Sequence, residues 1–184
     1  RTGKGGIVDT SLYENSLALM SIMFADHLAS GNLPVRHGSG VAMIVPYQAF
    51  EAADGYMMVA AGNDNLFRRL AAAIGRPSLA EDPRFATNGN RVVNRDALVA
   101  TLADIFKTET RGHWASLFDA AGIPNGPINT MDQVVADPQT AALGQIQRDG
   151  GLSLVGLPLS FDGARPPFAK RAPALGEDNA TILG

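Results

Sequence analysis

The chain has 184 residues, which is the size of one domain or of a domain with an appended arm. Hydrophobic residues make up 46% and charged residues 18%, so the composition excludes a disordered, charge-rich chain. A net charge of −3 argues against nucleic acid as a partner, and the absence of cysteine excludes disulfides, thiolate catalysis and zinc–thiolate sites.

No apolar run approaches the roughly 20 residues that a membrane span needs, so we expect no membrane contact. The sequence begins at Arg1 without an initiator Met or a signal peptide. We therefore expect a piece of a longer, cytoplasmic protein.

The first 32 residues predict a short strand and a long helix. Ile7–Ser11 has the composition of a strand. From Leu12 to Ala29 the apolar residues are spread around much of the helical circumference, which is typical of a helix buried on several sides. Gly31 is expected to end this helix in a left-handed conformation.

A loop and a hairpin follow. Pro34, Gly38 and Gly40 exclude regular structure over residues 33–40. Two strand-like segments then flank Asp54-Gly55, and this arrangement is a strong β-hairpin signal.

Helices are predicted for most of the next part of the chain. Asn63 or Asp64 is expected to cap the first, a second is predicted over residues 90–107, and a third begins after Thr110. Two prolines over residues 123–128 predict an irregular loop.

The remainder of the chain changes character. Short helices are expected from Thr130 and Pro138, followed by strands over 145–147 and 152–155 around a glycine turn. The proline-rich segment Pro158–Pro173 predicts an extended arm, and a C-terminal helix is expected after it.

The residues alone give no convincing catalytic set. His27, His37 and His113 are too far apart in the sequence to match a metal-ligand spacing, so no metal site is predicted. The best local candidate is the loop His37–Gly40, because glycines let backbone N–H groups approach and cradle an anion. On the residues alone, a connector that requires positive φ explains these glycines more simply.

Several short blocks, in order along nearly the whole chain, together carry a resemblance. They are Gly3–Leu12, Pro46–Phe50, Asp54-Gly55, Ala61–Asp64, Phe67–Leu70, Asp82–Phe85, Asn90–Val92, Asn94-Arg95, Ala121–Asn129, Ala136–Gln139 and Leu175–Glu177. In order and spacing these blocks resemble the family III CoA-transferases, the group named for L-carnitine dehydratase and bile-acid-inducible protein F.

The resemblance implies the C-terminal part of an α/β fold, without its Rossmann-like domain. Residues 1–32 would form the end of a large domain and a connecting helix, 33–144 an α+β small domain with the glycine loop, and 145–184 a returning arm. In the family, the nucleophilic aspartate and most CoA contacts lie upstream of the segment that matches Gly3. No catalytic residue is therefore assigned here, and this chain alone is expected to be inactive.

For the complete enzyme the resemblance implies transfer of CoA between carboxylic acids through an aspartyl acyl intermediate. An acyl-CoA and an acceptor carboxylic acid would be its substrates, with no tightly bound cofactor. The glycine loop would act as a lid that excludes water from the reactive intermediates. The implied substrate-binding residues are His37, Gly38, Ser39, Gly40, Tyr47 and Gln48.

Two alternatives stay open. One is a fragment of a 2-methylacyl-CoA racemase, a branch of the family in which a carboxylate tends to lie near the position of Gln48. An amide cannot act as a general base, which favours the transferase. The other is an assembly module without catalysis. Because family members form interlocked dimers, the resemblance also implies a homodimer.

Overall fold

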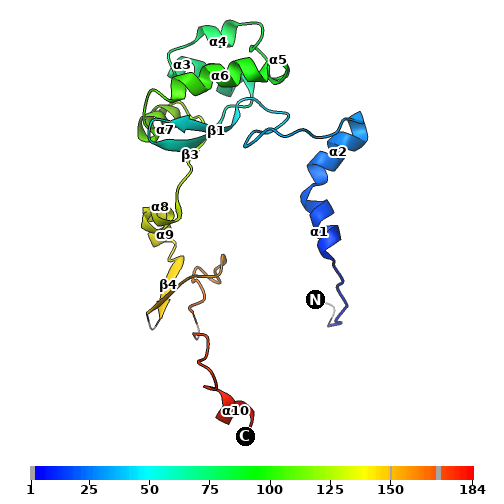
Figure 1. Cartoon of the computed structure of the whole chain (residues 1–184), viewed down its shortest axis with the longest axis vertical. Helices are drawn as coiled ribbons and strands as arrows, with labels where there is room; N and C mark the ends of the chain where they lie inside the picture. The colour runs from blue at the N-terminus through cyan, green and yellow to red at the C-terminus, as the bar shows by residue number, and fades with distance from the viewer. Residues whose placement is uncertain (1–2, 150, 169–170) are drawn as a thin grey trace.

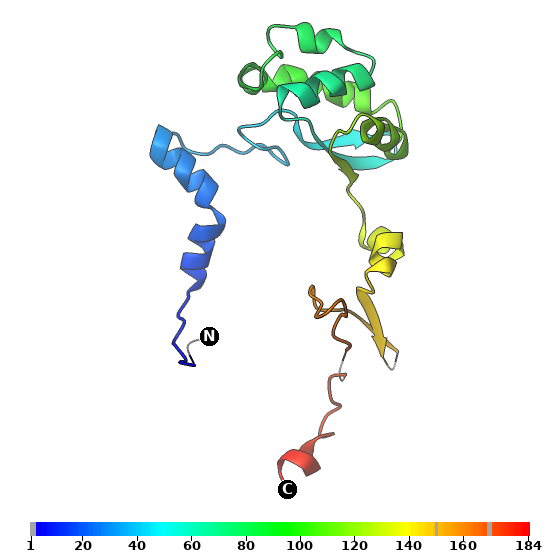
Figure 2. The same ribbon diagram turned by 180° about the vertical axis from the view of Figure 1, so that it is seen from behind.

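The computed structural model describes residues 3–149, 151–168 and 171–184. Helices α3 to α7 and a three-stranded sheet gather into one packed body, from which two arms extend (Figure 1). Both arms also lead away from this body when the molecule is seen from behind (Figure 2). The predicted mixed α/β small domain is confirmed, with antiparallel strands in both of the described sheets.

The predicted hairpin is the centre of the body. Strand β1 (Tyr47–Ala52) pairs antiparallel with β2 (Gly55–Ala60), in the register Tyr47↔Ala60 to Ala52↔Gly55. The two turn residues are Ala53 and Asp54, one position earlier than the expected Asp54-Gly55 turn. Gly55 instead begins β2 with a φ of 140°, a value that side-chain-bearing residues rarely adopt.

The expectation of an irregular loop over residues 123–128 was wrong. Asn125–Pro127 forms strand β3, which pairs with β2 on the side away from β1. The Ala60 N–H donates to the Pro124 carbonyl and the Ile128 N–H to the Tyr56 carbonyl. Because β3 is an edge strand, the nitrogen of Pro127 faces the free edge and no ladder hydrogen bond is lost.

Five helices of the body surround the sheet. They are α3 (Asp64–Ala73), α4 (Ser78–Glu81), α5 (Asn88–Val93), α6 (Arg95–Phe106) and α7 (Arg111–Ala120). Asn63 caps α3 by accepting the Leu66 N–H at 2.8 Å, which decides between the two predicted caps. Thr110 caps α7, as predicted. The helix predicted over 90–107 is in fact two helices, which meet at Asn94.

An aromatic cluster joins α6 and α7 to the sheet. Phe106 lies at its centre, with ring centroids 4.9 Å from Phe50, 5.4 Å from Trp114 and 5.7 Å from Phe118, all in edge-to-face geometry. All four side chains are buried, and the Trp114 indole N–H donates to the Phe106 carbonyl at 2.8 Å. Such aromatic contacts add stability beyond the area that they bury.

Among the described residues, Arg91 of α5 is the one charged residue that is fully buried. Its guanidinium donates to the carbonyls of Val45 (2.7 Å), Phe85 (3.0 Å) and Gly62 (3.1 Å), and to Asp64 Oδ1 (3.0 Å). Burial lowers the pKa of Arg91, and the hydrogen bond to Asp64 opposes that shift. Arg91 therefore fixes the segment that enters β1 against the helices.

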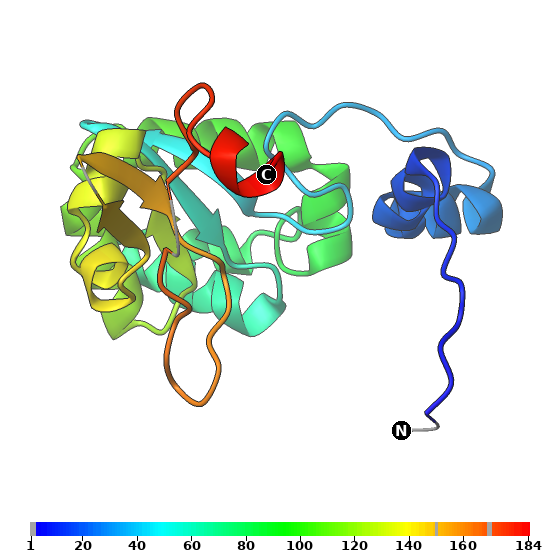
Figure 3. The ribbon, with the colours of Figure 1, turned by 90° about the horizontal axis from the view of Figure 1, so that it is seen from below.

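The N-terminal arm differs from the body. Its helices α1 (Leu12–Leu19) and α2 (Ser21–Ser30) are separated by Met20 and contain no buried residue. The view from below shows them apart from the body, joined by an extended segment (Figure 3). Gly31 ends α2 with a φ of 74°, as predicted, whereas burial of this helix and a strand at Ile7–Ser11 were wrong for this chain.

The C-terminal arm is also extended and contains short elements. They are α8 (Met131–Ala136), α9 (Pro138–Ala142), the antiparallel pair β4 (Ile146–Asp149) and β5 (Leu152–Val155), and α10 (Asn179–Ile182). The predicted turn residue at position 150 lies outside the described residues, as do positions 169 and 170 of the predicted proline-rich arm. The described part of that arm has no regular structure beyond a bridge between Phe161 and Ala164.

The two arms give the chain an unusually large surface. Its accessible surface is 13133 Å², whereas a compact monomer of 19.3 kDa exposes roughly 8,500 Å². Much of the excess is apolar, because the leucine, isoleucine and methionine side chains of α1 and α2 are exposed. No helix among the described residues is both long and apolar enough to cross a membrane.

Candidate functional site

The predicted glycine loop forms a tight turn before β1. The Gly40 N–H donates to the His37 carbonyl at 2.9 Å, and Gly38 adopts a φ of 61° inside the turn. A Cβ at Gly38 would meet open space, so the backbone conformation, and not crowding, requires glycine there.

The loop is docked on the free edge of the sheet. Strand β1 has β2 on one side only, which leaves alternate backbone groups along its other edge without a strand partner. The Tyr47 carbonyl accepts the Val41 N–H at 3.2 Å, and the Ala49 N–H donates to Ser39 Oγ at 3.1 Å. The segment from Ser39 to Val41 therefore covers the outer edge of β1.

Gly40 lies where three groups come together. A Cβ added to it would be 3.1 Å from the His37 carbonyl oxygen, 3.3 Å from Gln48 Oε1 and 3.4 Å from Arg95 Nη1. Here glycine is favoured by close packing, since a Cβ would force the His37 carbonyl or the two side chains to shift by a few tenths of an ångström, and no positive φ is involved. The two glycines of the loop are thus favoured for different physical reasons.

Arg95 is a residue at this site to which the sequence interpretation gave no role. Its Nη2 donates to the carbonyls of Val41 (2.8 Å) and Ala42 (2.5 Å), the two residues that follow the glycine turn. Its Nη1 is buried and has no hydrogen-bond partner among the described residues. Asn94-Arg95 did stand among the family-like blocks, but the contact spans more than fifty positions in the sequence, and no local pattern reveals it.

A cavity of about 620 Å³ lies between the glycine turn and the N-terminal arm. Its lining is mostly apolar on the helical side and is polar near the turn. The lining residues are Leu19, Met20, Ile22, Met23, Asp26, Pro34, Val35, Arg36, His37, Gly38, Gly40, Val41, Ala42 and Met43. The volume is in the range of small-molecule sites.

The structure brings the six predicted site residues to one side of the body, with unequal roles. His37, Gly38 and Gly40 line the cavity, and Gln48 lies against Gly40. Ser39 and Tyr47 serve the docking of the loop through the Ser39 hydroxyl and the Tyr47 backbone carbonyl.

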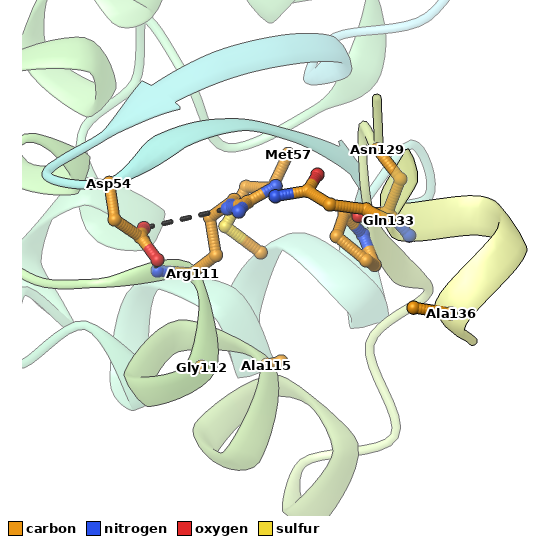
Figure 4. Close-up of a pocket in the computed structure, with 9 residues that line it drawn as sticks. Asp54, Met57, Arg111, Gly112, Ala115, Asn129, Gln133 and Ala136 are labelled. Carbon is orange, nitrogen blue, oxygen red and sulfur yellow. Dashed lines mark hydrogen bonds and ion pairs between the residues drawn. The ribbon is translucent and has the colours of Figure 1, made fainter. Parts of the chain in front are cut away.

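A second cavity, of about 440 Å³, lies at the opposite end of the hairpin around Arg111 (Figure 4). The Asp54 carboxylate accepts the Arg111 backbone N–H at 2.7 Å and lies 3.5 Å from Arg111 Nε. The hydrogen bond from the Arg111 backbone lowers the pKa of Asp54, and the guanidinium charge lowers it further. Because Asp54 neutralises Arg111, this cavity offers little net charge to an anion.

Metal chemistry finds no support among the residues that the structure describes. No group of three or more His, Cys, Asp and Glu side chains there is arranged to hold a metal ion.

The family model described as CoA-transferase family III matches residues 1–179. The chain belongs to CoA-transferase family III. Among the relatives of this family III chain, an acetyl-CoA:oxalate CoA-transferase from Acetobacter aceti is 35% identical over 99% of the chain. A succinyl-CoA:glutarate CoA-transferase from Homo sapiens is 34% identical over 100% of it.

Solved structures of family III agree with this membership. A CAIB/BAIF family protein from Brucella suis has a TM-score of 0.81 and 38% identity over 99% of the chain. The chain spans about half the length of these proteins: 47% of the Acetobacter relative, 43% of the human relative and 48% of the Brucella structure. The recognition of the family from the sequence is therefore confirmed.

Proposed function

We propose that this chain is the C-terminal part of a CoA-transferase that moves CoA between carboxylic acids. The observation that carries the proposal is the family III match over residues 1–179, shared with relatives that are named as CoA-transferases. The nucleophilic aspartate belongs to the part of the protein upstream of this chain. The same proposal includes a cytoplasmic location. It also includes the division of the chain into the end of a large domain with a connecting helix (residues 1–32), a small domain (33–144) and a returning arm (145–184).

In this proposal the turn His37–Gly40 is the lid over the reacting carboxylate. Its place at the rim of the 620 Å³ cavity supports that role, because backbone without side chains can approach an acyl group closely. An aspartyl anhydride or thioester reacts readily with water, so a lid that excludes water favours transfer over hydrolysis.

Gln48 supports a transferase over a racemase. Its amide lies beside Gly40 and can donate or accept a hydrogen bond, but it cannot remove the α-proton of an acyl-CoA. The acids in the names of the relatives include oxalate and glutarate, both small dicarboxylates. We propose this class of acid as the acceptor.

The test uses the intact protein that contains this chain. Acetyl-CoA or succinyl-CoA is supplied with oxalate or glutarate in deuterated water. The CoA thioesters are then separated, and their masses are determined by mass spectrometry. The proposal expects oxalyl-CoA or glutaryl-CoA as the new thioester. Glutaryl-CoA should contain no deuterium at its α-carbon, whereas the oxalyl group has no α-hydrogen to exchange. In a parallel reaction the protein is given a 2-methylacyl-CoA, and deuterium uptake at its α-carbon without CoA exchange would instead identify a racemase. The 184-residue chain alone is the control and should give no turnover.

We further propose that the exposed arms are contact surfaces for the rest of the protein and for a second copy of it. The excess surface fits this proposal, because obligate interfaces commonly bury 2,000–5,000 Å² or more. The isolated chain should therefore self-associate, with a mass by light scattering that rises above 19.3 kDa as its concentration increases. A constant monomer mass over a wide concentration range would contradict this.

A further inference from the structure

Arg95 stands at a position that helix electrostatics disfavours. It is the first residue of α6, where the partial positive charge of the helix N-terminus repels a cation. Helix stability therefore does not explain an arginine there. The contacts of Arg95 with the segment that follows the glycine turn explain it instead.

The Arg95 guanidinium holds the C-terminal end of the glycine loop. Nη2 donates to the carbonyls of Val41 and Ala42, while the Val41 N–H donates to the Tyr47 carbonyl of β1. Val41 is therefore tied to α6 by its carbonyl and to the sheet by its N–H. A charged donor makes hydrogen bonds stronger than those between neutral groups.

The second arm of the guanidinium is not used in this arrangement. Arg95 Nη1 is buried and finds no partner in the part of the chain that the structure describes, and a buried donor left unpaired is costly. The position of a Cβ on Gly40 would be 3.4 Å from Nη1 and 3.3 Å from Gln48 Oε1. The donor Nη1 and the amide oxygen Oε1 therefore both border the space that a Gly40 side chain would fill.

We propose that Arg95 is the positioning residue that anchors the glycine loop and orients the Gln48 amide. When the loop closes over substrate, Arg95 Nη1 donates to Gln48 Oε1. That bond occupies the acceptor end of the amide and leaves the Gln48 NH₂ group as a donor for an acyl or carboxylate oxygen. The inference rests on the proposed function, in which the loop covers the reacting carboxylate.

Arg95 differs from Arg91, four residues earlier, in what it supports. Arg91 is fully buried and bonds to the body on all sides, so its loss would unfold the body. Arg95 is half-buried, and its described hydrogen bonds all go to Val41 and Ala42. Substitution of Arg95 should therefore release the loop and leave the body folded.

The first experiment needs no catalytic activity. Arg95→Met keeps the apolar stem and removes the guanidinium, Arg95→Lys keeps one charged donor, and Arg68→Met is the control on the exposed face of α3. Hydrogen exchange of the 184-residue chain is then followed by NMR. Arg95→Met should speed exchange at the Val41 and Ala49 amides at least about tenfold, since their protection depends on local opening. Arg95→Lys should restore part of it, and Arg68→Met should change nothing.

The second experiment measures transfer and hydrolysis by the intact protein. Arg95→Met should lower kcat about tenfold or more, because misplacement by about 1 Å can cost on the order of a hundredfold. Hydrolysis should rise relative to transfer. Arg95→Lys should stay impaired in transfer, because one ammonium cannot reach the carbonyls and Gln48 together. Gln48→Ala should add little further loss in the Arg95→Met background.

The outcomes separate this inference from the proposed function. Unchanged exchange at Val41 and Ala49 in Arg95→Met would overturn the anchoring role whether or not the protein is a transferase. Full additivity of Arg95→Met and Gln48→Ala would overturn the orientation of the amide. If the wild-type intact protein transfers no CoA, the proposed function fails, and with it the catalytic part of this inference.

Discussion

The body and the N-terminal arm both contain helices rich in apolar side chains, but the body buries these side chains and the arm exposes them. Phe106 in α6 is 0% exposed, whereas Phe24 in α2 is 38% exposed and Leu28 is 81% exposed. Both helices have the apolar residues that burial requires. The difference is that α6 has β1 beside it in the same chain, and α2 has no such neighbour among the described residues. An apolar pattern therefore predicts that a helix will be covered, but not by which part of the protein.

The largest expected difference in stability comes from replacing one phenylalanine by alanine in each of the two regions. Phe106→Ala removes the centre of the aromatic cluster and should lower the free energy of unfolding by about 3–5 kcal/mol. Phe24→Ala should leave that free energy almost unchanged, because no core packs on this ring. Urea denaturation of both variants, followed by Trp114 fluorescence, makes the measurement.

The same two variants also test whether the N-terminal arm is a contact surface for self-association. Phe24→Ala should weaken self-association of the chain, whereas Phe106→Ala should act on folding. Equal losses of stability in the two variants would show that the arm packs on the body, against this account.

The next effect concerns the two glycines of the loop in the intact protein. Gly38→Ala forces a side chain into positive φ, and Gly40→Ala places a Cβ 3.1 Å from the His37 carbonyl oxygen. Each should lower kcat by about tenfold, which is about 1.4 kcal/mol in barrier, and should raise hydrolysis relative to transfer. The ratio of the two products is measured beside the melting curve. A lower melting temperature with an unchanged ratio would indicate a connector and not a lid.

The smallest effect is a pH-dependent one at the far end of the hairpin. The pKa of Asp54 is held below its ordinary value of 3.8 by the backbone N–H of Arg111 and by its charge. The carboxylate therefore stabilises the fold above that pH, and its contribution is lost as the pH falls through the lowered pKa. Asp54→Asn should melt slightly below wild type at neutral pH. The gap should close in acid, and a gap that persists there would rule out the charged pair as its cause.

Most of the body was predictable because its signals are local. The hairpin follows from Asp54-Gly55 between apolar strands, and the start of α7 from the cap Thr110. Strand β3 was missed because its pairing with β2 is set by the fold, and the prolines beside it suggested only a loop. The break at Asn94 was missed because the apolar pattern continues through it.

The candidate site was predictable in part for the same reason. His37–Gly40 was found as a glycine loop, and the family resemblance gave it a role. Its docking on the edge of β1 and its contact with Arg95 join positions far apart in the sequence, so no local pattern contained them. The composition of α1 and α2 predicts that they are buried, but no described part of this chain covers them.

Hydrogen exchange of the isolated chain and of the intact protein tests the central claim most directly. The amides of β2, α6 and α7 should exchange slowly in both, because the body supplies its own core. Those of α1 and α2 should exchange fast in the isolated chain and slowly in the intact protein, where we propose that the rest of the protein and a second copy cover them. Slow exchange of α1 and α2 in the isolated chain, or fast exchange in both samples, would contradict the account.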